Sequence, residues 1–255
     1  MTNANLAGEH LSVTFGGFTA LRDVTLSFEA GRVYGIIGPN GAGKTTFANV
    51  LSGIVAPTAG SLVLDGRDIT REPLHRRARL GIGRSFQIIN IFGAMSVLEN
   101  LRMGAQATRF TVQPFWRTIA SHPELLDRAE SMLRFVRLEP MRDQLAGTLS
   151  HGDQRALEIG LALMSDPRIL ILDEPLAGVG QEGTERALRL VRDAARGRTM
   201  IIIEHNMDAI MALSDRIVVL VGGRVLAVGS PDEIRHNDAV RVAYLGTEDD
   251  SHPGA

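Results

Sequence analysis

The sequence predicts an α/β fold with a mainly parallel core, an antiparallel β subdomain and an inserted α-helical subdomain. Three observations support this prediction. A glycine-rich loop around residue 40 joins an apolar run to a helical segment. Three short apolar runs between residues 169 and 220 have the continuous form of strands buried on both faces, and the segment from about 96 to 165 shows helical periodicity.

Composition narrows the class of protein. The chain has 255 residues, of which 44% are hydrophobic, and a formal net charge of -2, which suits one large globular domain or two modest lobes. A net charge so close to zero gives no indication of a surface that binds nucleic acid. The chain contains no cysteine, which excludes disulfides and thiolate metal sites. No apolar run approaches the roughly 20 residues of a membrane helix, so we expect neither a secreted nor an integral membrane protein.

The glycine-rich loop fits the pattern G-x-x-x-x-G-K-[ST] and lies between the apolar run at 33–37 and a helix. Strand, glycine loop and helix in that order form a phosphate cradle, because consecutive backbone N–H groups and the positive helix end surround an oxyanion. The expected phosphate-binding residues are Gly38, Pro39, Asn40, Gly41, Ala42, Gly43, Lys44, Thr45 and Thr46. The Thr45 hydroxyl is placed to ligate Mg²⁺. We therefore predict a P-loop NTPase core that binds ATP or GTP, the alternative being a glycine-rich turn without a ligand.

Lys44 is the one lysine among the 27 Lys and Arg residues of the chain. Every other basic position carries the planar guanidinium of arginine. Retention of a single compact ammonium suggests that this position needs a point charge between phosphates.

The N-terminal third alternates apolar and polar residues, as half-buried strands do, with a turn at Gly16–Gly17. The predicted elements are strands at 10–15, 24–28, 33–37, 61–64 and 81–86 and a short arginine-rich helix at 73–80. This order places antiparallel strands around the phosphate loop.

From about residue 96 the sequence has the capping residues and periodicity of helices. Ser96 and Glu99 have the spacing of a capping box, a second helix is expected over 123–138, and a third lies within 149–164. The core resumes with buried strands at 169–172, 200–203 and 217–220, separated by helices of about 15 and 8 residues, which is βαβ spacing. A hairpin turn at 221–224 leads to a last strand.

These elements predict one domain over residues 6–246. Its β-rich and parallel core comprises 6–95 and 166–246, and the helical subdomain comprises 96–165. Residues 247–255 are polar and are expected to be a disordered tail.

Two carboxylates, Asp173 and Glu174, directly follow the buried run at 169–172. The carboxyl end of a parallel strand faces the crevice where α/β sheets bind ligands, so we expect Asp173 on the strand next to the phosphate loop. There Asp173 would hold Mg²⁺ and Glu174 would polarise the attacking water. The alternative is a solvated acidic pair before Pro175.

His205 ends the next buried run and can donate to a γ-phosphate if its strand lies beside that of Asp173, the alternative being an ordinary histidine at a strand end. Glu204 is a competing base, ranked below Glu174 because Glu174 adjoins the metal ligand. Gln87 lies where the β-rich part meets the helical insert, in reach of Mg²⁺ or water, and a surface glutamine is the alternative.

Apolar residues follow Gln87 at positions 88, 89, 91 and 92, and these either belong to the core of the insert or form a partner surface. Residues 149–154, Leu-Ser-His-Gly-Asp-Gln, precede a helix and form a second anion-binding terminus far along the chain from the first. A single nucleotide cannot obviously use both termini of one subunit, which suggests a site shared between two chains.

Together these motifs make nearly the whole chain, from about Leu11 to Gly246, resemble an ATP-binding cassette ATPase. The motifs are the Walker A loop at 38–45, the Q-loop glutamine Gln87, the signature at 149–154, the Walker B strand at 169–173 and the switch histidine His205. The resemblance implies a head-to-tail dimer in which each ATP lies between one subunit's P-loop and the other's signature, here Ser150 and Gly152. It also implies Mg²⁺ as a cofactor.

The resemblance further implies an aromatic ring against adenine at Phe15. Phe18 is the neighbouring alternative, and a phenylalanine in the core of the β subdomain is the third interpretation.

Within the family, four segments resemble the ATPases of bacterial importers of branched-chain (hydrophobic) amino acids, and urea and short-amide importers share much of the pattern. The segments are 83–87, 149–159, 173–178 and 243–246. Two positions depart from the family. His151 replaces a glycine of the signature and changes the surroundings of the γ-phosphate, and Gly180 replaces an aspartate or asparagine that bears on communication across the dimer.

This subgroup implies a second ATPase subunit, with a heterodimer expected and a homodimer as the alternative. It also implies separate transmembrane permease subunits, a periplasmic solute-binding protein, and a peripheral position on the cytoplasmic side of the inner membrane. The apolar residues beside Gln87 would press on a cytoplasmic segment of the permease.

Two rival functions belong to other classes. A soluble cassette ATPase acting on DNA or ribosomes tends to carry tandem cassettes, coiled-coil insertions or basic patches, and this chain is a single short cassette with a net charge of -2. A nucleotide-regulated scaffold without turnover is disfavoured by the intact Glu174.

Overall fold

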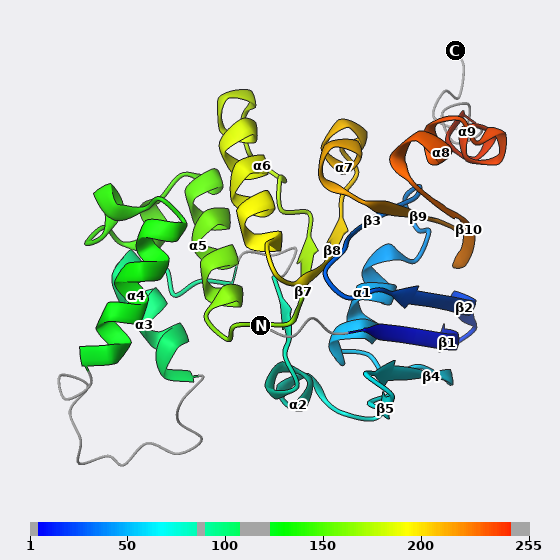
Figure 1. Cartoon of the computed structure of the whole chain (residues 1–255), viewed down its shortest axis with the longest axis horizontal. Helices are drawn as coiled ribbons and strands as arrows, with labels where there is room; N and C mark the ends of the chain where they lie inside the picture. The colour runs from blue at the N-terminus through cyan, green and yellow to red at the C-terminus, as the bar shows by residue number, and fades with distance from the viewer. Residues whose placement is uncertain (1–4, 86–89, 108–122, 246–255) are drawn as a thin grey trace.

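The computed structural model describes residues 5–85, 90–107 and 123–245. Within these ranges the chain forms two sheets and a set of helices (Figure 1). The first sheet has four antiparallel strands in the order β2-β1-β4-β5, and the second has six strands in the order β10-β9-β3-β8-β7-β6. The predicted α/β class is confirmed. The predicted tail at 247–255 lies outside the described residues.

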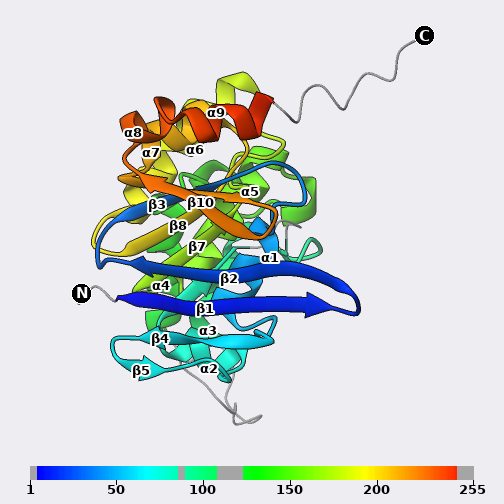
Figure 2. The same ribbon diagram turned by 90° about the vertical axis from the view of Figure 1, so that its right-hand side faces the viewer.

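The antiparallel sheet is built from the N-terminal third of the chain, and α1 lies behind it in Figure 2. Its strands are β1 (Leu6–Phe15), β2 (Phe18–Phe28), β4 (Ala59–Leu64) and β5 (Arg67–Asp68). The β1–β2 hairpin turns at Gly16–Gly17, as the sequence predicts. The short helix α2 (Leu74–Arg79) follows this sheet.

The six-stranded sheet is parallel except for β10, which pairs antiparallel with β9. Its strands are β3 (Val33–Ile37), β6 (Ile82–Arg84), β7 (Ile169–Asp173), β8 (Thr199–Ile203), β9 (Arg216–Val221) and β10 (Arg224–Gly229). Every residue of β7 and β8 is buried, because both faces of the sheet are covered.

The period of two along these strands separates two hydrophobic cores. On β7, Leu170 and Leu172 point to a core that they share with the helices of the insert and with α6, whereas Ile169 and Ile171 point to a core shared with α1 and the antiparallel sheet. The continuous apolar runs in the sequence are therefore strands that supply both cores at once.

The helices between β6 and β7 lie side by side on one flank of the core sheet (Figure 1). They are α3 (Val97–Ala107), α4 (Pro123–Phe135) and α5 (His151–Leu163), with short 3₁₀ turns at Glu139–Met141 and Ala146–Thr148. The predicted capping box is confirmed, because the Ser96 amide donates to Glu99 Oε2 at 3.0 Å and the Glu99 amide donates to Ser96 Oγ at 3.2 Å. Of the apolar residues predicted to follow Gln87, those at 88 and 89 lie outside the described residues. Ile91 packs against the core, whereas Phe92 is exposed.

The C-terminal part adds α6 (Gln181–Ala195), α7 (Met207–Leu213), α8 (Pro231–Arg235) and α9 (Asp238–Leu245). The helices α8 and α9 were not predicted from the sequence. The signal was present, because Ser230 and Glu233 form a complete capping box with Pro231 in the first turn. None of the helices in the described ranges is long and apolar enough to cross a bilayer.

The helix that follows the phosphate loop, α1 (Lys44–Ser52), is held at its far end by a buried arginine. The Arg77 guanidinium donates to the carbonyls of Val50 and Leu51, which are in the last turn of α1, and to those of Thr70 and Glu72. A cation at the negative end of a helix is favourable, and Arg77 adds donors to the last carbonyls of α1, of which that of Val50 also accepts from the Gly53 amide at 3.2 Å. Burial lowers the pKa of Arg77 to about 10, which leaves it charged at neutral pH.

Replacing Arg77 with methionine should lower the free energy of unfolding by about 3 kcal/mol, because several buried carbonyls lose their donor. Urea denaturation followed by circular dichroism measures this loss. The control is Arg76→Met on the same helix, whose side chain is 64% exposed and should change stability by less than about 0.5 kcal/mol. Equal midpoints for the two variants would contradict the capping role.

Candidate functional site

The phosphate loop, residues 38–43, lies between β3 and α1 at the carboxyl end of the core sheet. Gly38 and Gly43 have positive φ angles of 154° and 97°, and both pack against backbone. A Cβ atom on Gly38 would lie 2.1 Å from the Leu220 carbonyl oxygen, and one on Gly43 would lie 2.6 Å from that of Ala20. These glycines are needed because no side chain fits where the loop touches β2 and β9.

Lys44 lies in the first turn of α1 and its side chain folds back over the loop. Its Nζ donates to the carbonyl oxygens of Gly38 at 2.6 Å and Pro39 at 3.0 Å. Burial lowers the pKa of this ammonium, and the nearby carboxylates of Glu174 and Asp173 act in the opposite direction. The single lysine of the chain is therefore held inside the predicted cradle, within electrostatic range of both predicted catalytic carboxylates.

Asp173 ends β7 and is paired with a buried arginine that the sequence analysis did not identify. Arg84 Nη2 lies 3.0 Å from Asp173 Oδ2, and the two side chains are 3% and 1% exposed. Arg84 Nη1 also donates to Ser52 Oγ at 2.8 Å, which ties the carboxylate to the end of α1. Burial raises the pKa of Asp173, and the Arg84 guanidinium opposes that rise.

The prediction that Asp173 lies on the strand next to the phosphate loop is wrong. Strand β8 lies between β3 and β7, and it pairs in parallel with both. The order of strands in the sheet does not follow their order in the chain, because a helical crossover can place a later strand between two earlier ones. Lys44 and Asp173 still interact across this intervening strand.

The residues predicted to hold Mg²⁺ suit a hard cation. Asp173 Oδ1 is buried and has no hydrogen-bond partner among the described residues, so it retains a lone pair for a ligand. The Thr45 hydroxyl is exposed at the start of α1, and oxygen donors of these two kinds are those that Mg²⁺ takes in proteins. The third predicted ligand, Gln87, lies outside the described residues.

Glu174 follows Asp173 in a strained conformation. Its φ angle is 50°, in the left-handed region that side chains other than glycine rarely adopt. Its amide donates to the Ile203 carbonyl at 2.8 Å, which fixes the turn against the end of β8. A strained residue that is held in place in this way is typical of a functional site.

Glu204 cannot readily act as a base, because its carboxylate is buried and already occupied. Oε1 accepts from the Leu176 amide at 2.9 Å, and Oε2 accepts from the amides of His205 at 3.1 Å and Asn206 at 3.3 Å. Glu204 therefore joins the loop that follows Glu174 to the loop that carries His205.

His205 follows β8, and its side chain is exposed. The predicted adjacency is confirmed, because Asp173 of β7 pairs in register with Ile203 of β8. The strand ends thus bring Asp173, Glu174 and His205 to the carboxyl end of the core sheet.

The two candidate adenine-stacking rings lie at the tip of the β1–β2 hairpin. Phe15 and Phe18 are cross-strand partners and are 50% and 62% exposed, so a place in the core is wrong for both. The hairpin reaches the phosphate loop through Ala20, whose carbonyl faces Gly43. An aromatic face at either position is free to stack on a base.

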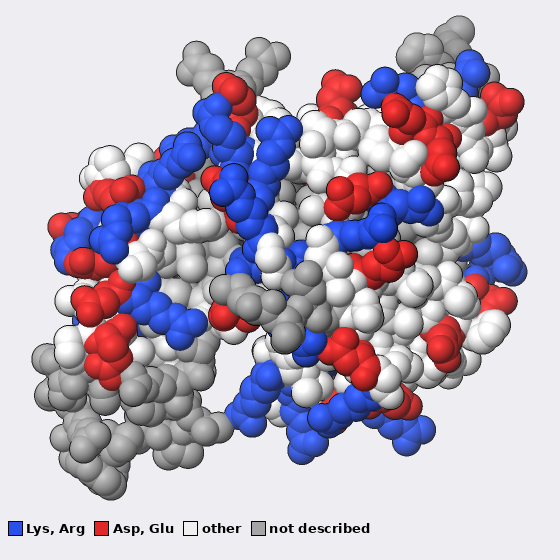
Figure 3. All heavy atoms as spheres, viewed as in Figure 1, with Lys and Arg blue, Asp and Glu red and all other residues white. Residues whose placement is uncertain are grey.

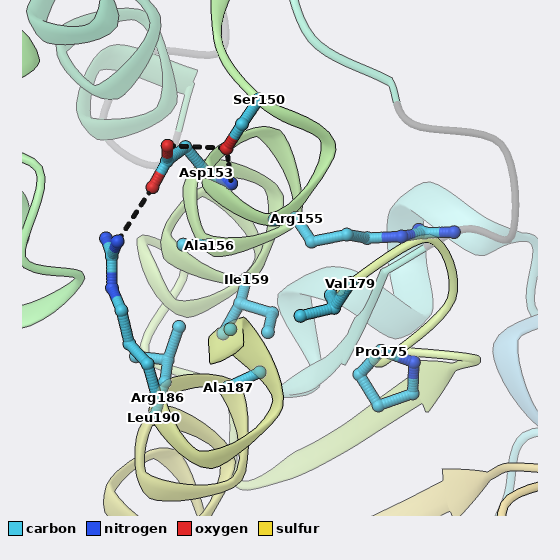
Figure 4. A pocket seen from close by; sticks show the side chains of 12 residues that line it. Ser150, Asp153, Arg155, Ala156, Ile159, Pro175, Val179, Arg186, Ala187 and Leu190 are labelled. Carbon is cyan, nitrogen blue, oxygen red and sulfur yellow. Dashed lines mark hydrogen bonds and ion pairs between the residues drawn. The ribbon is translucent and has the colours of Figure 1, made fainter. Parts of the chain in front are cut away.

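The second predicted anion site is the N-terminus of α5. Ser150 is its N-cap and accepts from the Asp153 amide at 3.2 Å, and Gly152 lies in the first turn. The Ser150 hydroxyl donates to Asp153 Oδ2 at 2.6 Å, and Asp153 Oδ1 pairs with Arg186 of α6 at 2.9 Å. This chain of contacts borders a cavity of about 100 Å³ between α5 and α6 (Figure 4).

The two predicted phosphate sites do not meet within the subunit. In Figure 1, α5 lies on the opposite side of β7 and β8 from α1. This arrangement agrees with the expectation that a second chain completes each site.

Comparisons with known proteins agree with this geometry. The family model described as "ABC transporter" matches residues 21–177, more than half of the chain, and a second, described as "Branched-chain amino acid ATP-binding cassette transporter", matches 224–250. The chain belongs to the ABC transporter ATPase family.

Relatives and solved structures cover nearly the whole cassette. The chain is 41% identical in sequence to the high-affinity branched-chain amino acid transport ATP-binding protein BraF of Pseudomonas aeruginosa, over 92% of this chain and 95% of that protein. It is 38% identical to LivG of Salmonella typhimurium, over 96% and 99%. The crystal structure of a nucleotide-free ATP-binding cassette from an ABC transporter superposes with a TM-score of 0.83 at 31% identity, covering 96% of this chain and 99% of that one.

Both departures from the family can be placed in this cassette. His151 is exposed at the start of α5 and lies beside Gly178 in the loop after Walker B. Gly180 is the N-cap of α6 with a φ of −63°, which any residue can adopt, and no side chain caps the helix there. The cassette therefore has room at Gly180 for the polar side chain that its family usually carries, since a Cβ atom would meet nothing within 4 Å.

Replacing Glu204 with glutamine should lower the free energy of unfolding by about 2 kcal/mol, because the carboxamide turns one of its N–H groups toward a backbone donor. Hydrogen exchange should accelerate at the amides of Leu176, His205 and Asn206. Glu72→Gln is the control, since the Glu72 carboxylate, just before α2, accepts from the side chains of Arg67 and Arg76. Unchanged exchange at the three amides would show that Glu204 does not join the two loops.

Proposed function

We propose that this cassette hydrolyses ATP to drive import of branched-chain or other hydrophobic amino acids through separate membrane subunits. The observation that supports the proposal is the position of Lys44, Asp173, Glu174 and His205 at the carboxyl end of the core sheet, in a chain whose relatives are transport ATP-binding proteins. The carboxyl-terminal match to the branched-chain family model supports the choice of solute.

Catalysis by these residues consists mainly of positioning and charge neutralisation. The P-loop amides and the Lys44 ammonium bind the β- and γ-phosphates, for which Lys44 exchanges its carbonyl partners for phosphate oxygens. A magnesium ion held by Thr45, Asp173 and Gln87 would neutralise charge on those phosphates when bound. Glu174 orients and polarises the attacking water, and His205 contacts the γ-phosphate.

Assembly follows from the separation of the two phosphate sites. A second ATPase subunit supplies its signature motif to this P-loop, and Ser150 and Gly152 of this chain face the partner's nucleotide. We propose a heterodimer docked on two permease subunits at the cytoplasmic side of the inner membrane, supplied by a periplasmic solute-binding protein. The near-neutral charge of the chain and the mixed acidic and basic side chains of the face in Figure 3 do not favour a nucleic-acid partner.

Replacing Glu174 with glutamine should reduce ATP turnover by about 10²-fold or more, because the group that polarises water is lost, while ATP binding changes little. Phosphate release and retention of radiolabelled ATP by the purified protein measure the two effects. Equal turnover in the two proteins would show that Glu174 takes no part in hydrolysis. If the unmodified protein did not bind ATP, the proposed function itself would be wrong.

Deleting the gene for this chain should lower uptake of radiolabelled leucine, isoleucine and valine by its own cells about tenfold at low solute concentration, because transport is coupled to hydrolysis. Urea and acetamide uptake, measured in the same cells, is the control. Loss of urea or acetamide uptake with intact leucine uptake would assign the cassette to the related group of importers.

A further inference from the structure

Arg186, on the helix that follows the Walker B loop, makes contacts that no sequence motif accounts for. Its Nη1 pairs with Asp153 Oδ1 at 2.9 Å, and its Nη2 donates to the Arg137 carbonyl, just beyond the end of α4, at 3.1 Å. Basic side chains are numerous over α6 in Figure 3, and Arg186 is the one drawn in contact with the signature motif in Figure 4. The guanidinium is thus fixed between α4, α5 and α6.

Asp153 poses an electrostatic problem for the anion site that it adjoins. Its carboxylate lies in the first turn of α5, where a negative charge stabilises the helix end. The same helix end is the expected position of a γ-phosphate, and two anions at one helix terminus repel each other. The Asp153 side chain is only 13% exposed, so water screens this repulsion poorly.

The Ser150 hydroxyl has a single proton, and Asp153 now accepts it. Binding of a phosphate oxygen requires that proton to turn from Asp153 to the phosphate. Asp153 Oδ2 then loses its donor at the moment when a second anion arrives, and Arg186 on Oδ1 is the remaining counter-charge in this chain of contacts.

We propose that Arg186 is a positioning residue that neutralises Asp153, so that Ser150 and the first turn of α5 can accept the γ-phosphate held by the second subunit. This inference rests on the proposed function and adds a residue of α6 to the shared site. It predicts that loss of Arg186 weakens ATP-driven closure of the dimer and leaves binding of ATP to the subunit's own P-loop unchanged.

The test uses the tagged chain, purified from its own cells with its accompanying subunits, in a Glu174→Gln background. The amount of radiolabelled ATP that the complex retains after gel filtration, measured over a range of MgATP concentrations, reports closure of the dimer. Arg186→Gln should raise the half-saturating MgATP concentration about tenfold. Adding Asp153→Asn should restore it to within about threefold, because the charge that needed neutralising is gone. Arg186→Lys, which keeps the charge, should fall between the parent and Arg186→Gln.

The control is Arg189→Gln, one turn further along α6, whose partner Glu185 is exposed. It should leave retention unchanged. A fluorescent ATP analogue titrated into the isolated chain measures binding to the P-loop, which should differ less than about twofold between parent and Arg186→Gln.

Three results would overturn the inference: unchanged retention in Arg186→Gln, a defect that Asp153→Asn does not rescue, or an equal loss of analogue binding in the isolated chain. Failure of the parent chain to bind ATP at all would instead overturn the proposed function, so the two outcomes are distinguishable.

Discussion

The buried ion pair between Arg84 and Asp173 is the interaction on which the geometry of the candidate site depends. Two charges withdrawn from water are costly unless each finds a partner in good geometry, and here one guanidinium bonds both the Walker B carboxylate and Ser52. Because Ser52 is in the last turn of α1, the pair fixes the helix behind the phosphate loop relative to β7. It also leaves Asp173 Oδ1 without a donor among the described residues.

Two other buried charged residues, Arg77 and Glu204, are satisfied by backbone groups. Arg77 is surrounded by carbonyl oxygens and Glu204 by amides. These residues fix the position of one chain segment relative to another. Hydrogen bonds can do this because they have direction, whereas apolar contacts do not. The loops carrying Glu174 and His205 are joined in this way.

Much of the architecture could be predicted from the sequence because its signals are local. The phosphate loop, the capping box at Ser96 and the apolar runs of β7 and β8 each depend on neighbours in the chain. Arg77 and Arg84 could not be found in this way, because partners that hold them buried lie as far as 27 and 89 residues away and nothing near them in the sequence marks a buried cation. The position of β8 between β3 and β7 was missed for the same reason, since chain order does not determine strand order. Helices α8 and α9 are different, because their capping signal was present and was overlooked.

The central place of β8 limits how His205, the proposed contact of the γ-phosphate, can move. This strand forms parallel ladders with β3 on one side and β7 on the other, so sliding it lengthwise would break both ladders together and misalign every side chain in the two cores. Under the proposed function, His205, directly beyond the end of β8, would respond to nucleotide by rotation about its own backbone and side-chain bonds. Movement would then be confined to the loops at the carboxyl end of the sheet, while the strands keep their register.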